Sequence, residues 1–224
     1  MRIGSVIKAR ALAVMELGEL NRDGKVRFSE CVAPIVQRYE FETFPTKPED
    51  FNEETGVKFV SGKFKGSIIE SLVIYSGAIY VDGVRNTAES KEMLLDLANW
   101  GREELGLTFS EKQIRRWAYI SDLMFYPDFP WLDTYSSPLE KLARKTSAVT
   151  EEIFGGLEYR PSRISIAHDP MKRNHNVAEF SITHRINTSF DDNVYFSEAP
   201  LPTDLHIKFI EEFEEDIRAQ NASR

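Results

Sequence analysis

The sequence predicts an α+β fold, a single domain with a mainly antiparallel sheet and about four to five helices packed largely on one face. Three observations predict it. Strand-like and helix-like segments are grouped along the chain and do not alternate one by one. Glycine and proline turns separate the short apolar runs. With 224 residues, 42% of them hydrophobic, the chain is long and apolar enough to bury a substantial core.

One domain over residues 1–224 is the simplest organisation, because we find neither an internal repeat nor a low-complexity tract. The 44–56 loop is the candidate for an internal boundary, since it holds two prolines and an acidic cluster. Residues 11–20 favour a short strand over a helix. A helix then runs to about Glu40, and we expect it to begin near Pro34, because proline is tolerated only in the first turn.

The middle of the chain predicts a meander of short strands followed by a helix. β-Branched and aromatic residues concentrate in 57–60, 67–75 and 78–81, which glycines separate. Thr87 is expected to cap a helix whose apolar stripe ends before Gly106.

The second half predicts a strand over 117–126, two strands over 163–168 and 178–187 that could pair as a hairpin, and a helix on each side of them. The first helix opens with the capping sequence Ser137-Pro138-Leu139-Glu140. Its apolar positions follow as one face: Leu139, Leu142, Ala143, Thr146, Val149 and Ile153.

The last helix is expected to begin at a capping Thr203 and to be amphipathic. The apolar side chains that should be buried are Phe209, Ile210, Phe213 and Ile217. The glutamates expected to face water are Glu211, Glu212, Glu214 and Glu215.

The net charge and the cysteine content limit the kinds of partner and the cellular compartment that we expect. The formal net charge of −8 repels phosphate backbones and anionic surfaces, so nucleic acid would need a local basic region such as Arg115, Arg116 and Arg163. The sequence contains no run of 18 consecutive apolar residues, so no membrane-spanning helix is predicted. The lone Cys31 fits a reducing compartment. We therefore expect a cytoplasmic protein that holds no cofactor and does not enter membranes.

Histidines and a carboxylate provide the most concrete candidates for chemistry. His168 and Asp169 leave one predicted strand, His184 lies on the next, and His206 follows near the start of the last helix. Together they could hold a metal ion for a hydrolase or nuclease. Their spacing matches no ligand motif, however, and Asp169 also opens a common turn, so ordinary surface or core roles remain open.

Aromatic residues in two proline-rich segments are the candidates for partner binding: Phe125, Tyr126, Phe129, Trp131, Tyr195 and Phe196. Aromatic rings of this number must be shielded from water by other residues. Either they fold back over the protein's own core, or they anchor a partner, because aromatic residues on stiffened loops lose little entropy on docking.

These observations together predict a non-enzymatic interaction or assembly module that binds a protein partner or self-associates. We expect it to be an accessory subunit of a larger bacterial complex. The prediction depends on the missing catalytic motifs and on the aromatic segments. The metal-assisted hydrolase or nuclease and a nucleic-acid-binding subunit are the alternatives.

Overall fold

The computed structural model describes residues 1–24, 26–134, 137–155, 157–169, 171 and 177–222. By its internal contacts the chain divides into two compact units. We call residues 6–121 with 200–203 the N-terminal unit, and residues 1–5, 122–199 and 204–224 the C-terminal unit. The 44–56 loop lies inside the N-terminal unit. A single domain over the whole chain stays a prediction.

The N-terminal unit contains most of β1 (Arg2–Val14), α1 (Phe28–Tyr39), β2 (Val57–Phe64), β3 (Ser67–Tyr75), β4 (Ala78–Gly83), α2 (Thr87–Glu104) and the first part of β5 (Arg116–Tyr126). Its strand order is β2-β3-β4-β1-β5. The pairs β2–β3, β3–β4 and β4–β1 are antiparallel, from Val57 opposite Ile74 to Val14 opposite Ala78. The predicted α+β class with a mainly antiparallel sheet is confirmed, and so is the meander β2–β4.

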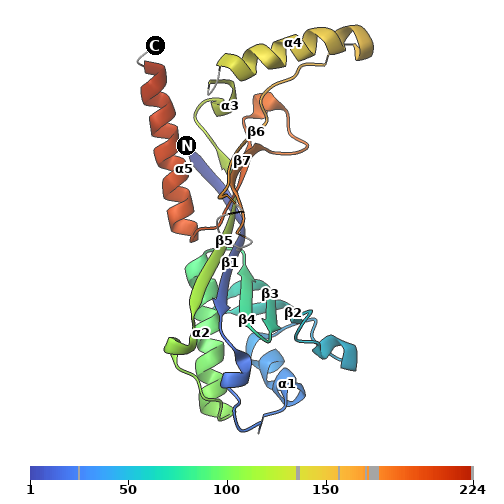
Figure 1. Ribbon diagram of the computed structural model, residues 1–224, viewed down its shortest axis with the longest axis vertical. Coiled ribbons are helices and arrows are strands. Elements are labelled where there is room, and N and C mark those ends of the chain that lie inside the picture. The colour runs from blue at the N-terminus through green and yellow to red at the C-terminus, as the bar shows by residue number, and fades with distance from the viewer. Residues whose placement is uncertain (25, 135–136, 156, 170, 172–176, 223–224) are drawn as a thin grey trace. The chain divides into compact units, whose positions relative to one another are not determined.

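The core of this unit lies where α1 and α2 pack against the strands, and Figure 1 shows both helices beside β2–β4. One cluster of buried residues includes Ile35 from α1, Met93 and Leu97 from α2, and Phe59 and Leu72 from the sheet. The helices therefore bury their apolar faces against the sheet, as expected for this fold class.

The first strand runs from Arg2 to Val14 and not over 11–20, so it begins and ends earlier than predicted, and Leu17–Glu19 form a short 3-10 helix. Its buried positions are Ala9, Ala11 and Ala13, which alternate as a strand requires. Alanine carries little β-propensity, so this face gave only a weak signal. The small side chains let α2 come close, and Ser90 Oγ donates a hydrogen bond of 2.7 Å to the carbonyl oxygen of Ala9.

Two expected helix starts were wrong. The first helix begins at Phe28, so Pro34 lies inside it, and burial of Cys31, Val32 and Ile35 offsets the backbone hydrogen bond that proline cannot donate. In α2 the cap is Asn86 and not Thr87, since the Asn86 side chain accepts from the Ala88 N–H.

The C-terminal unit contains α3 (Trp131–Thr134), α4 (Ser137–Phe154), β6 (Arg163–Ile166), β7 (Phe180–His184), β8 (Tyr195–Ala199) and α5 (Thr203–Ala222) from Asp204 onward. The strand order here is β1-β5-β8-β7-β6. The predicted hairpin is confirmed, because Arg163 of β6 lies opposite Thr183 of β7. Strand β8, which pairs with β7, was not predicted.

The last helix differs from its predicted faces at two positions. Ile210 and Ile217 are buried as expected, whereas Phe209 is 41% exposed. Glu214, expected to face water, is only 5% exposed. Its carboxylate accepts hydrogen bonds from the Asp128 N–H at 2.8 Å and from Trp131 Nε1 at 3.2 Å, which compensates for its lost hydration.

Candidate functional site

The aromatic segments form the core of the C-terminal unit. Phe125, Trp131 and Tyr195 are at most 3% exposed. The ring centroids of Phe125 and Trp131 lie 5.2 Å apart, those of Phe125 and Tyr195 5.7 Å, and Phe213 of α5 meets Trp131 edge-on at 5.5 Å. The chain's own residues thus cover these three rings, as in the first of the two interpretations of the sequence.

The other three aromatic candidates keep part of their surface exposed. Tyr126, Phe129 and Phe196 are half-buried. The Arg2 guanidinium lies 4.3 Å from the Tyr126 ring centroid, and the Arg218 guanidinium lies 5.9 Å from that of Phe129. These cation–π contacts also belong to the C-terminal unit. Partner binding through the six aromatic residues stays a prediction.

The three candidate histidines lie in different environments. His168 and Asp169 are exposed after β6, and Asp169 accepts from the Met171 N–H as a turn residue does. His184 is buried, with its ring 4.3 Å from that of Phe190 and Nε2 3.0 Å from the Ser189 carbonyl oxygen.

His206 is fully buried on α5. Its Nε2 lies 2.8 Å from Ser197 Oγ, and its ring meets Phe180 edge-on. His184 and His206 therefore contact polar and aromatic groups of the core. Among the described residues no group of three or more histidine, cysteine, aspartate or glutamate side chains could hold a metal ion. The metal-assisted hydrolase gains no geometric support here.

The basic candidates are divided between the two units. Arg115 lies in the N-terminal unit and forms ion pairs with Glu16 at 3.2 Å and Glu19 at 3.5 Å. Arg116 beside it is exposed. Arg163 lies in the C-terminal unit and pairs with Glu179 at 2.9 Å. Carboxylates close to Arg115 and Arg163 offset the positive charge that a nucleic-acid backbone would require.

A cavity of about 260 Å³ opens in the N-terminal unit between α1, α2 and the turn after β1. Its walls are mainly apolar, with Phe28, Ile35 and Trp100 among them. Among its polar residues, the Asn21 side-chain amide is hydrogen-bonded to the Val26 backbone. Burial raises the pKa of the Cys31 thiol, which keeps the thiol neutral. These groups offer little for catalysis. This cavity was not predicted from the sequence.

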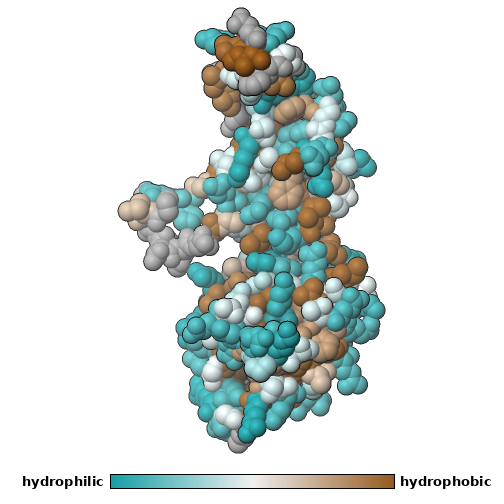
Figure 2. Space-filling model, turned by 90° about the vertical axis from the view of Figure 1, so that its right-hand side faces the viewer, coloured by the Kyte–Doolittle hydropathy of each residue, from teal (hydrophilic) through white to brown (hydrophobic). Residues whose placement is uncertain are grey.

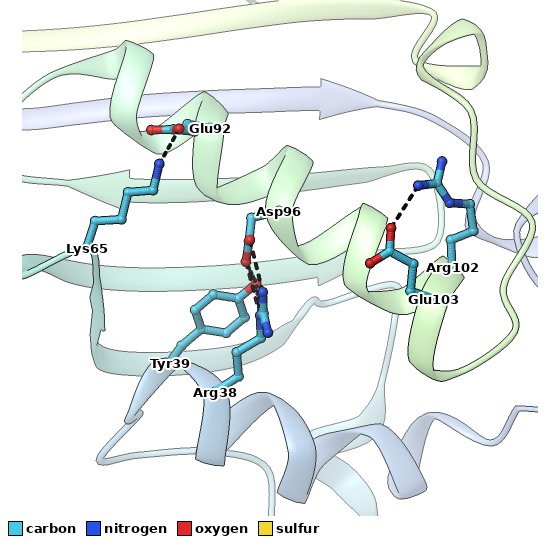
Figure 3. A network of polar contacts seen from close by, with 7 residues as sticks. All are labelled: Arg38, Tyr39, Lys65, Glu92, Asp96, Arg102 and Glu103. Atoms are coloured by element: carbon cyan, nitrogen blue, oxygen red, sulfur yellow. Dashed lines mark hydrogen bonds and ion pairs between the residues drawn. The ribbon is translucent and has the colours of Figure 1, made fainter.

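Polar contacts join α1 to α2 in the N-terminal unit (Figure 3). The Arg38 guanidinium donates to both carboxylate oxygens of Asp96, at 3.0 and 3.1 Å, and the Tyr39 hydroxyl donates to Asp96 at 2.6 Å. Burial and the hydrogen bond to Asp96 raise the pKa of Tyr39. Burial opposes ionisation of Asp96, but the bonds from Arg38 and Tyr39 outweigh it and lower the pKa of Asp96. This network holds two helices together.

A second ion pair is more deeply buried. Arg10 of β1 donates to Asp82 of β4 at 2.6 and 2.8 Å, and Ser71 of β3 adds a hydrogen bond of 3.0 Å to the same carboxylate. The Arg10 guanidinium also lies 3.9 Å from the Tyr80 ring centroid. The hydrogen bond with Asp82 raises the pKa of Arg10. The pair joins the neighbouring strands β1 and β4, which is a structural role.

Helix α4 presents an apolar face to solvent. Leu139 is 46% exposed, Leu142 60%, Val149 61% and Ile153 66%. Figure 2 shows hydrophobic surface gathered over α4 at the top of the view. The neighbouring positions Ala143, Ser147 and Thr150 are half-buried, and Ser147 Oγ accepts a hydrogen bond of 2.8 Å from the Tyr159 N–H. The chain after α4 therefore covers another side of the helix and leaves the apolar face open.

Hydroxyl groups do not make this face polar. Thr146 lies at its centre and donates from Oγ1 to the Leu142 carbonyl at 3.0 Å. Thr150 donates in the same way to Thr146. A hydroxyl that donates within its own helix has its hydrogen bond satisfied there and adds little polarity to the surface. We call Leu139, Leu142, Thr146, Val149 and Ile153 the α4 seam.

The comparisons leave the family open. No protein-family model matches the chain, and no curated protein matches it. Across the part of the chain that the structure describes, no helix is both long and apolar enough to span a membrane. The α4 seam is therefore the candidate functional site that the geometry itself singles out.

Proposed function

We propose that the chain is a non-enzymatic protein-interaction or assembly module, an accessory subunit of a larger bacterial complex. The exposed α4 seam is the observation that carries this proposal. A monomer rarely exposes contiguous apolar surface without a use for it, and an amphipathic helix is a common docking element. A cytoplasmic location belongs to the same proposal, supported by the single, unpaired Cys31.

The hairpin of β6 and β7 adds a second surface for contact. Strand β6 is last in the strand order of its unit, so one of its edges has no neighbouring strand within the described sheet. Ile166 at its end is 66% exposed. Arg163 and Ser165 both bond Glu179, which places polar groups along β6 and discourages indiscriminate pairing. A partner could still extend the sheet at this edge.

The test is native mass spectrometry of the protein purified from its own host, together with a variant of the α4 seam. We expect a defined complex from the unaltered protein and loss of that complex in Val149→Asp. Ala148→Asp is the matched control, because it adds the same charge at the adjacent, exposed position outside the seam. A monomer without any bound protein would refute the proposal, and a complex that both variants retain would refute the α4 seam as its binding surface.

A further inference from the structure

We infer that the α4 seam pairs with the α4 seam of a second copy of this chain, with the two helices antiparallel. This inference rests on the proposed function and names the partner. The five positions of the seam are separated by 3, 4, 3 and 4 residues. That repeat produces a narrow stripe suited to one facing helix, whereas a helix that packs on a sheet needs a wider apolar face.

The charges of α4 select the orientation. In sequence, the first half of the helix carries three basic residues, Lys141, Arg144 and Lys145, against Glu140 alone. The only charged residues of the second half are Glu151 and Glu152. An antiparallel pair sets each basic half against an acidic half, twice by symmetry. A parallel pair would set like charges side by side, which favours the antiparallel arrangement.

The basic side chains are available for such contacts. Lys141, Arg144 and Lys145 are exposed, and the ion pair of Arg144 with Glu140 is long, at 3.4 Å. Exposed pairs of this kind contribute little and exchange easily. A two-fold axis across the seam produces a closed dimer, because each helix offers the same surface to the other.

Two measurements test this inference. Size-exclusion chromatography with light scattering should show a dimer for the unaltered protein and for Ala148→Asp. Val149→Asp places a charge in the centre of the contact and should weaken dimerisation by about tenfold or more. Thermal unfolding of both variants checks that the fold is retained.

Disulfide trapping reports the orientation. In the double variant Leu139→Cys with Ile153→Cys, oxidation of an antiparallel dimer should link position 139 of one copy to 153 of the other, as read by peptide mapping. Cys31 is buried and serves as the background control in the unaltered chain. Linkage of 139 to 139 would overturn the antiparallel arrangement.

The outcomes separate this inference from the proposed function. A dimer that survives Val149→Asp, or a monomeric protein that binds a different partner through α4, overturns self-pairing and leaves the interaction module standing. A monomeric protein with no partner in native mass spectrometry overturns both.

Discussion

Helices α2 and α4 have the same length, 18 residues, and opposite surroundings. In α2 the buried side chains include Met93, Leu94 and Leu97, which lie against the sheet of the N-terminal unit. In α4 the seam residues Leu139, Leu142, Val149 and Ile153 are about half to two-thirds exposed. The spacing differs as well, because α2 has adjacent buried positions at 93 and 94, whereas the seam of α4 has none.

The comparison shows that an apolar stripe on a helix does not by itself indicate its own protein's core. A wide stripe covers a sheet, and a narrow seam suits one facing helix. Four experiments test this contrast.

The largest loss of stability is expected from a substitution in the core of the C-terminal unit. Trp131→Ala removes a fully buried ring that contacts Phe125, Tyr195 and Phe213. We expect the free energy of unfolding to fall by about 3–5 kcal/mol. Urea denaturation measures it. A loss below about 1 kcal/mol would mean that this aromatic segment is not core and could serve a partner after all.

The two helices can be compared directly by truncating one side chain in each. Met93→Ala should cost about 2–5 kcal/mol, because the side chain is fully buried. Val149→Ala should change the stability by no more than about 0.5 kcal/mol when it is measured at a concentration where the protein is monomeric. Equal losses in denaturant unfolding would show that the α4 seam is buried within one chain.

The ion pairs of the two regions should also differ in their contribution to stability, with the larger contribution in the N-terminal unit. Asp82→Ala leaves the Arg10 guanidinium and the Ser71 hydroxyl without their carboxylate, and we expect a loss of about 1–3 kcal/mol. Glu140→Ala on α4 removes an exposed partner of Arg144 and should cost less than about 0.5 kcal/mol. Thermal unfolding of both variants checks the order, and a reversed order would contradict it.

The smallest effect is a dependence on pH in the N-terminal unit. The pKa of Asp96 is lower in the folded state, so its contribution is complete above its unfolded pKa of about 3.9 and is lost as the pH falls through the folded pKa. Asp96→Asn should therefore be less stable than the unaltered protein at pH 7, by up to about 1 kcal/mol, and the difference should shrink as the pH falls below about 3.9. A difference that stays constant across this range would exclude the mechanism.

Much of the secondary structure could be predicted from local signals. Strand β3 was predicted with its observed limits, because β-branched residues between two glycines marked it. Strand β8 was missed, since Tyr195 and Phe196 lie among prolines that suggested a loop. The start of α1 was misplaced because tertiary burial of Cys31 and Val32 outweighed the local cost of Pro34.

The candidate site could be predicted only in part. The apolar positions of α4 are visible in the sequence, but their exposure is not, since periodicity does not tell which element covers a face. The sequence likewise could not show that Trp131 donates to Glu214, a partner 83 residues away. Long-range contacts of this kind decide whether an aromatic residue is core or surface.

The small residues beneath α2 have a consequence for recognising relatives of this protein. Ala9 lies opposite Gly83, and a Cβ atom at Gly83 would come within 2.9 Å of Ser90 Oγ. A branched side chain at any of these three places would push the helix off the sheet. During divergence the large apolar residues can interchange, whereas positions 9, 83 and 90 should stay restricted to glycine, alanine or serine. That restriction is a spacing signature by which distant homologues could be identified when overall similarity has been lost.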